Sequence, residues 1–309
     1  MGAESDAPPA PPAPPTPPTP PTPPPCPSQS PNPKTPSEPV PAPALAPAPA
    51  PNNPRPPPTG PLCAPLLPSS DLTLTPLVPH QIYLIRNFLP ASLCKTYAAF
   101  LSSLPLTTTP GRPKKDEAVR VNDRFQVDDA RFAETLWSTT ALRELVTERF
   151  DGDHDDEYEH EHEPKPETET GDGDAHVHNR LAQTRALWGG IPLGLNPNIR
   201  IYRYTEGQFF GQHYDESNAL TFLPAGATRA APARTTWTLL VYLTTCAGGE
   251  TVFYPEATRA EPRPAALAVA PEVGMALLHR HGDACMLHEG REVTGGEKWV
   301  LRSDLVVAR

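Results

Sequence analysis

The sequence has no apolar run long enough to cross a membrane as a helix, and its cysteines do not pair in a recognisable spacing. They are Cys26, Cys63, Cys94, Cys246 and Cys285, an odd total without a C-x-x-C pair. This argues against a disulfide framework and suits a reducing compartment. An apolar stretch typical of a secretory signal peptide is also lacking. We therefore expect an intracellular protein, cytoplasmic or nuclear or both, without a membrane anchor.

An excess of basic charge is also lacking, since the formal net charge is −10. The acidic residues concentrate between Asp151 and His178, where twelve Asp or Glu stand against one Lys. Outside this block, basic and acidic residues nearly balance. The chain therefore offers no overall positive field, and we expect no nucleic-acid partner.

Large apolar residues are scarce at the N-terminus, where most of the 46 prolines stand. Residues 1–75 cannot bury enough apolar surface to offset the entropy of ordering, so we expect disorder with local polyproline II structure. The repeat PPTPPTPP resembles ligands of SH3 and WW domains, although a disordered tail or linker explains it without a partner. We expect one domain over 76–309, with an acidic disordered insertion at about 151–179.

The periodicity of apolar residues predicts helices first and strands afterwards. Residues 81–88 are apolar and β-branched, as in a strand. Helical spacing of apolar residues predicts one helix over 89–104 and a second over 129–150.

From Asn198 onward the pattern changes to a period of two. Strands are predicted at 198–204, 236–244, 274–279 and 298–307. Several strands separated by Gly- and Pro-bearing turns, following helices, predict a mainly β protein with flanking helices (α+β), built on a jelly-roll or barrel.

The β-rich half contains a candidate metal site. His213 and Asp215 stand two residues apart and point to the same face of a strand, where both can bind one ion. His288 is the third candidate ligand. Two imidazoles and one carboxylate on one face of an octahedron leave positions open for a co-substrate and O2, which suits Fe(II). His279 and His281 are rival third ligands, but a glycine-marked turn and a lysine follow His288 alone.

That lysine, Lys298, begins a predicted buried strand. A buried ammonium group is costly unless it meets a carboxylate, and a dicarboxylate co-substrate would supply one. Arg302 has the same parity on the strand and is a second candidate for this ion pair. The sequence leaves the choice between them open.

Taken together, these motifs resemble the prolyl 4-hydroxylase-like (alpha-subunit catalytic domain) branch of the Fe(II)/2-oxoglutarate-dependent dioxygenase superfamily, over about residues 80–309. The matching residues are Arg200-x-Tyr202-x-Tyr204, Gly207, Phe210, His213-x-Asp215, Tyr242-Leu243, Gly248-Gly249-Glu250-Thr251-x-Phe253, and His288 with Lys298.

The resemblance implies a double-stranded β-helix, an eight-stranded jelly roll with supporting helices. It implies that His213, Asp215 and His288 hold Fe(II) and that 2-oxoglutarate chelates this iron through its keto acid group. Lys298 would pair with the far carboxylate of 2-oxoglutarate, with hydrogen bonds from Tyr242 and Tyr204. The implied reaction consumes O2 and 2-oxoglutarate, releases succinate and hydroxylates a C–H bond, often with L-ascorbate to keep iron reduced.

The substrate is less constrained than the iron chemistry. Members that modify collagen typically have Cys-Pro-Val after the third ligand, where this chain has Arg291-Glu-Val. We expect a protein or peptide side chain as the substrate. The alternatives are a small-molecule hydroxylase with the same iron site and a non-catalytic jelly-roll binding module.

Overall fold

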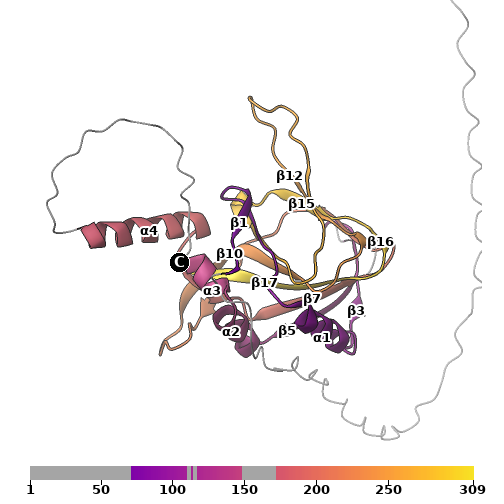
Figure 1. Cartoon of the computed structure of the whole chain (residues 1–309), viewed down its shortest axis with the longest axis horizontal. Helices are drawn as coiled ribbons and strands as arrows, with labels where there is room; N and C mark the ends of the chain where they lie inside the picture. The colour runs from indigo at the N-terminus through magenta and orange to yellow at the C-terminus, as the bar shows by residue number, and fades with distance from the viewer. Residues whose placement is uncertain (1–70, 110–112, 114–116, 148–171) are drawn as a thin grey trace, which may run out of the picture. The chain divides into compact units, whose positions relative to one another are not determined.

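The computed structural model describes residues 71–109, 113, 117–147 and 172–309 (Figure 1). Most of the tail predicted at 1–75 and of the insertion predicted at 151–179 lies outside these residues, so both remain predictions. Among the described residues, no helix is both long and apolar enough to pass through a membrane.

The larger of two main sheets contains ten antiparallel strands. In order, they are β1 (Thr75–Val78), β2 (Ile82–Ile85), β14 (Ala276–Arg280), β10 (Ala231–Tyr242), β17 (Lys298–Ala308), β7 (Asn198–Tyr204), β5 (Asp123–Asp128) and β3 (Thr107–Thr108), with β6 (Pro192–Leu195) paired to β17 and β9 (Ala219–Phe222) paired to β10.

The smaller main sheet contains five strands and faces the larger one (Figure 1). They are β13 (Leu267–Val269), β12 (Thr251–Tyr254), β15 (Leu287–Gly290), β8 (Phe209–His213) and β4 (Arg120–Val121), and a separate pair joins β11 (Ala247–Gly248) to β16 (Val293–Gly295). Eight strands make up the jelly roll, and the chain passes back and forth between the two main sheets as it forms them. The large sheet contains β7, β10, β14 and β17, and the small sheet contains β8, β12, β13 and β15. The predicted double-stranded β-helix is thereby confirmed.

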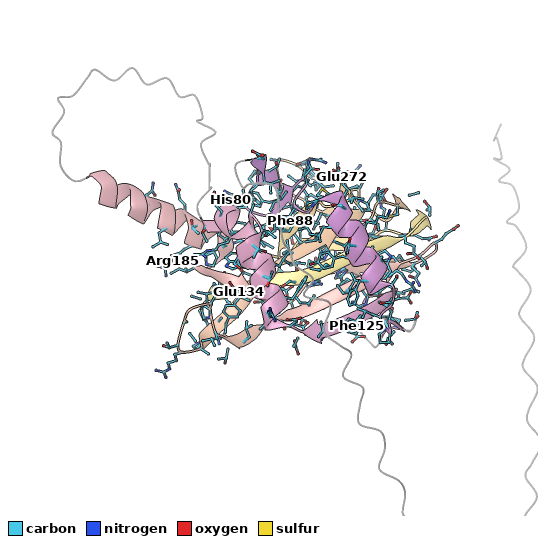
Figure 2. All side chains as sticks on the ribbon, turned by 60° about the horizontal axis from the view of Figure 1, so that its bottom comes forward. His80, Phe88, Phe125, Glu134, Arg185 and Glu272 are labelled. Atoms are coloured by element: carbon cyan, nitrogen blue, oxygen red, sulfur yellow. The ribbon has the colours of Figure 1, made fainter. Side chains whose placement is uncertain are left out.

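The helices are α1 (Ala91–Leu101), α2 (Ala130–Thr139), α3 (Leu142–Thr147) and α4 (Asp172–Trp188), with a short 3-10 helix η2 (Gly282–Ala284). Helices α1 and α2 lie in front of the large sheet when it is viewed from its outer side (Figure 2). The rings of Tyr97 and Phe132 meet edge to face between them, 6.1 Å apart. The two helices thus close the outer core of the large sheet.

Two helix boundaries differ from the sequence predictions. The helix predicted at 89–104 begins at Ala91, because Pro90 is extended and forms its N-cap. The prediction of one continuous helix over 129–150 was wrong, because the structure has two helices, α2 and α3, separated at Thr140. The hydroxyl of Thr140 donates to the carbonyl of Leu136 and accepts the N–H of Leu142. It therefore ends one helix and caps the next. Helix α4 was not predicted, and it includes residues 172–179 of the expected insertion.

The alternation predicted along β7 separates two cores. Ile199 and Ile201 belong to the outer core with the helices, whereas Tyr202 and Tyr204 pack between the two sheets. The inward face of β7 continues across β17, where Lys298 lies opposite Tyr204 and Arg302 opposite Arg200. The polar residues of the sequence motifs are thereby placed inside the jelly roll.

Candidate metal centre

Neighbouring strands of the small sheet bring together side chains that are distant in the sequence. His213 is the last residue of β8, and Asp215 follows two residues later. His288 lies on β15, directly opposite His213 in the strand register. The antiparallel pairing of β8 with β15 therefore places both histidines beside the carboxylate.

The three side chains form a compact donor set. Nε2 of His213 lies 3.8 Å from Oδ1 of Asp215, and Nε2 of His288 lies 3.7 Å from Oδ2. One ligand atom of each residue lies within 4.8 Å of the other two. Such spacing suits three ligands of one ion, because metal–nitrogen and metal–oxygen bonds are about 2 Å long.

Both histidines are oriented by their second ring nitrogen. Nδ1 of His213 donates to the carbonyl of Gly211 at 2.8 Å, and Nδ1 of His288 donates to the carbonyl of Met286 at 2.9 Å. A carbonyl only accepts, so the proton lies on Nδ1 and the lone pair on Nε2 faces Asp215. This is the usual arrangement of metal-binding histidines.

The protonation states also suit a metal. Burial lowers the pKa of His213 to about 4 and also lowers the pKa of His288. Burial alone would raise the pKa of Asp215, but Arg302 and the nearby histidines hold it well below its usual range. Near neutral pH the set is therefore two neutral imidazoles and one carboxylate, the form that binds a cation.

Arg302 contacts the carboxylate of this set from behind. Its Nη1 lies 3.0 Å from Oδ1 of Asp215, and its Nη2 lies 3.5 Å from Oδ1 of Asp304. The hydroxyl of Thr238 also donates to Oδ2 of Asp215, at 2.8 Å. The guanidinium group of Arg302 is thus engaged by two carboxylates, and it orients Asp215.

Lys298 lies at the start of β17, in the same cavity as the three donors. Its Nζ donates to the carbonyl of Gly249 at 2.6 Å and lies 5.5 Å from the ring centre of Tyr204. Among the described residues no carboxylate pairs with Nζ. Burial lowers the pKa of Lys298 to about 8. The cavity therefore contains a buried amine that an anionic ligand would stabilise in its charged form.

Of the two tyrosines predicted to contact the co-substrate, only Tyr204 lies at the surface of the cavity. Tyr242 is fully buried, and its hydroxyl shares a hydrogen bond of 2.7 Å with Oγ1 of Thr251. The side chain that lines the cavity at this point is Thr251, which the sequence marked only as part of the Gly-Gly-Glu-Thr motif. His281 bonds to Thr238 and lies outside the donor set.

His279 is the residue whose place sequence reasoning missed. It is only 2 % exposed, and its Nε2 lies 3.6 Å from Oδ2 of Asp215. The sequence gave it only as a rival of His288, whereas the structure brings both to the same carboxylate.

A second, wider groove opens over the donor set. Its lining mixes basic, acidic and uncharged polar side chains, which include Arg120, Arg124, Arg200, Glu117, Glu216, Gln126 and Asn198, and it also includes His213 and Asp215. The guanidinium of Arg120 lies 4.7 Å above the ring of Phe210, and this ring stacks on His213 at 3.6 Å. The segment 117–124 contributes Glu117, Ala118, Arg120 and Arg124 to this groove.

The donor set fits the iron of a non-haem oxygenase. Two imidazoles and one carboxylate on one face suit Fe(II), and the cavity that they line also includes Lys298. A keto diacid would suit this cavity, because its keto acid group could bind the open positions of a cation and its second carboxylate could pair with the amine.

Comparison with known proteins agrees with this chemistry. Residues 199–303 match the family described as the 2OG-Fe(II) oxygenase superfamily. No curated protein matches the sequence.

The solved structures to which the chain is similar include a prolyl-4-hydroxylase from Pseudomonas putida (15 % identity, 74 % of this chain and 95 % of that chain covered, TM-score 0.42). Another is the viral collagen prolyl hydroxylase of Paramecium Bursaria Chlorella virus-1 (14 %, 74 % and 97 %, TM-score 0.38). A third is HygX from Streptomyces hygroscopicus, solved with nickel and 2-oxoglutarate (14 %, 74 % and 83 %, TM-score 0.38).

The matched segment runs from β7 to β17 and includes all three donors and Lys298. Over residues 199–303 the chain thus resembles the Fe(II)- and 2-oxoglutarate-dependent oxygenases of this superfamily.

Proposed function

We propose that the chain hydroxylates a C–H bond in the side chain of a protein or peptide, as prolyl hydroxylases do. His213, Asp215 and His288 hold the iron, and Lys298 holds the far carboxylate of 2-oxoglutarate. The observation that carries this proposal is the common cavity: three convergent donor atoms at one part of it and a buried amine without a carboxylate partner among the described residues at another.

Different residues of the chain would bind the co-substrate, orient the metal ligand and exclude water. Iron with 2-oxoglutarate supplies the oxidation, in which O2 and 2-oxoglutarate yield succinate, CO2 and the hydroxylated C–H bond. Lys298 and Thr251 fix the co-substrate by charge and hydrogen bonding. Arg302 keeps Asp215 ionised and oriented. The packed tyrosines and Phe253 exclude bulk water from the inner cavity, which strengthens each of these interactions.

The groove favours a peptide that carries acidic groups. Small-molecule pockets are mostly apolar, whereas this groove is open and rich in polar side chains. Arg120, Arg124 and Arg200 line this groove together with Glu117 and Glu216, and guanidinium groups are suited to bidentate binding of carboxylates. A substrate with Asp or Glu near the target residue therefore complements the groove better than a polycationic small molecule.

The test uses the full chain, loaded with Fe(II) without oxygen and titrated with 2-oxoglutarate. The iron–keto acid chelate gives a visible charge-transfer band. We expect the band in the wild type and its loss in His213→Ala, with Gln212→Ala as the exposed neighbouring control. Iron-loaded wild type without the band would contradict the proposed co-substrate site.

The substrate is tested separately, by following succinate formation with peptide libraries and with small hydroxylatable metabolites. Stimulation by peptides with acidic flanks supports the proposal. Stimulation by small metabolites alone would assign the same iron site to a small-molecule hydroxylase. A site that binds iron and 2-oxoglutarate but never turns over would support a binding module.

A further inference from the structure

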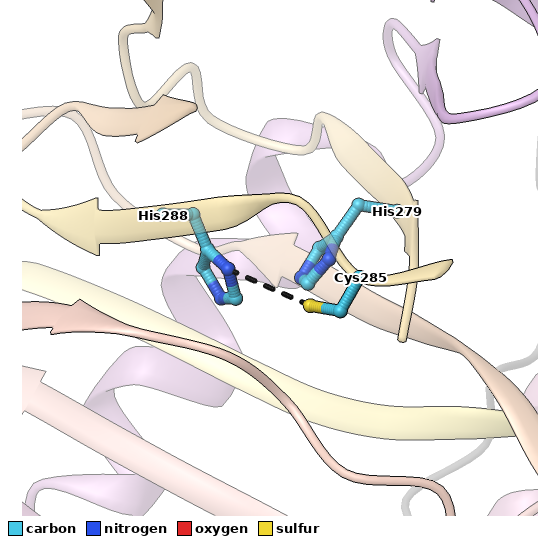
Figure 3. Close-up of side chains that lie close together, drawn as sticks. All are labelled: His279, Cys285 and His288. Atoms are coloured by element: carbon cyan, nitrogen blue, oxygen red, sulfur yellow. Dashed lines mark hydrogen bonds between the residues drawn. The ribbon is translucent and has the colours of Figure 1, made fainter. Parts of the chain in front are cut away.

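A second donor set adjoins the proposed iron site. His279, Cys285 and His288 each offer one ligand atom, and these atoms lie within 4.8 Å of one another. The three side chains come from different segments: the end of β14, the residue after η2, and β15 (Figure 3). The jelly roll therefore gathers them in the same way as it gathers the first set.

His279 is prepared as a ligand. Its Nδ1 donates to the carbonyl of Arg280 at 3.1 Å, so that Nε2 carries the lone pair. This Nε2 is buried and has no hydrogen-bond partner. Buried polar atoms without partners are rare and costly, and a bound cation would satisfy this one. A hydrogen bond from Nδ1 to a backbone carbonyl also orients His213 and His288, so His279 is a third histidine held in this way.

Cys285 is held beside these rings. The backbone N–H of Asp215 donates to its Sγ at 3.2 Å, and Sγ lies 3.9 Å from Nδ1 of His288 (Figure 3). The sulfur is thereby fixed between the two proposed metal-binding segments. A sulfur with two imidazoles forms a softer donor set than two imidazoles with a carboxylate.

We propose that His279, Cys285 and His288 form a second metal position that takes a soft divalent cation, with zinc as the best fit. The Cys285 thiol releases its proton to solvent when the ion binds. Nδ1 of His288 is engaged by Met286, which leaves Nε2 as its one free nitrogen. Each ion therefore needs the same atom, and occupation of the soft position removes the third ligand from the iron site.

The consequence is competition between two metals for one histidine. Iron at His213, Asp215 and His288 supports turnover, and zinc at the soft position prevents it without a change of fold. This inference uses the proposed iron site only through His288.

The experiment titrates the metal-free full chain with Co²⁺, a probe whose bond to a thiolate gives a near-ultraviolet charge-transfer band. We expect this band in the wild type, in His213→Ala and in the control Cys246→Ser, which removes a partly buried thiol outside the cluster. We expect its loss in Cys285→Ser and in His279→Phe, which keeps an aromatic ring against Phe253. Zinc should bind at least about tenfold more weakly to both of these variants.

A wild type that binds Co²⁺ without the thiolate band, or a band that persists in Cys285→Ser, would overturn the proposal. Simultaneous binding of two ions per chain would overturn the competition for His288. These outcomes are separate from the 2-oxoglutarate band, so failure of the soft site and failure of the oxygenase proposal are distinguishable.

Discussion

Nη1 of Arg302 lies 3.0 Å from Oδ1 of Asp215, so the carboxylate proposed to bind iron is already paired with a buried cation. The pairing continues behind it, because Asp304 contacts both Arg302 and Arg200, at 3.5 Å and 2.5 Å. Asp215 is therefore the inner end of a line of alternating charges that reaches the groove. Arg302 supports a metal ligand in this arrangement, and Lys298 remains the candidate for the co-substrate.

Replacement of Arg302 should destabilise the fold. Arg302→Leu leaves two buried carboxylates without their shared cation, and breaking a buried pair from one side costs about 3–5 kcal/mol. The measurement is urea unfolding of the metal-free chain. Arg86→Leu is the control, because Arg86 and Glu272 form an exposed pair worth less than about 1 kcal/mol. Equal stability of the two variants would contradict the supporting role of Arg302.

Replacement of Lys298 should weaken 2-oxoglutarate. Lys298→Met keeps the length of the side chain and removes its charge. Loss of a charged hydrogen bond costs about 1.5–3 kcal/mol, which corresponds to a roughly 10- to 100-fold higher Kd. Titration of the charge-transfer band measures this Kd, with the exposed Lys95→Met of α1 as the control. An unchanged Kd in Lys298→Met would contradict the pairing of Lys298 with the co-substrate.

The binding of 2-oxoglutarate should also depend on pH. Burial lowers the pKa of Lys298 from 10.5 to about 8, with smaller opposing effects from Cys246 and Glu250. Only the protonated amine pairs with a carboxylate. Between pH 7 and 8 the affinity should therefore change little, and above pH 8 it should fall by up to about tenfold per pH unit. Lys298→Arg, which stays charged, should remove this fall between pH 7 and 9.5.

The lowered pKa of Lys298 also means that the ligand-free chain should become more stable as the pH rises above 8. The folded state holds Lys298 at a lowered pKa, so burial of its charge destabilises the ligand-free chain below pH 8. This penalty, about 3 kcal/mol from the difference between 10.5 and about 8, fades as the pH rises from 8 to 10.5. Unfolding free energies across this range should rise for the wild type relative to Lys298→Met. Parallel curves would mean that Lys298 is not buried in its charged form.

A change in the groove should affect the peptide and not the co-substrate. Arg120→Glu reverses a charge that lies 4.7 Å from the ring of Phe210. We expect at least about a tenfold higher KM for an acidic peptide, because one favourable charge contact becomes a repulsive one. Steady-state kinetics with varied peptide and varied 2-oxoglutarate separate the two constants. Arg131→Glu, exposed on α2, is the matched control, and an unchanged peptide KM would place the substrate elsewhere.

Much of the fold could be predicted because its signals are local. The period-two pattern of β7 and the apolar run within β10 are properties of a few neighbouring residues, and the structure contains both strands. The break at Thr140 was missed because its cause is one hydroxyl that bonds in both directions along the chain. Helical spacing alone continues through such a residue.

Part of the candidate site was also predictable. His213 and Asp215 share a face through strand geometry, and the turn and lysine after His288 distinguished it from other histidines. By contrast, Tyr242 was expected to contact the co-substrate, and the structure places Thr251 between its hydroxyl and the cavity. That order depends on how β10 and β12 pack, which no local pattern contains.

The sequence by itself thus determined the predicted class of chemistry, metal-dependent oxidation with a keto acid. The ligand residue types, the strand face they share and the lysine that follows are all properties of short stretches of residues. The tertiary structure alone decided that Arg302 pairs with Asp215 while Lys298 has no carboxylate partner among the described residues, and it alone brought His279 and Cys285 to His288. The physical reason is that ion pairs and metal sites depend on distances of a few ångströms between residues of different strands. Those distances are set by the register of the whole jelly roll.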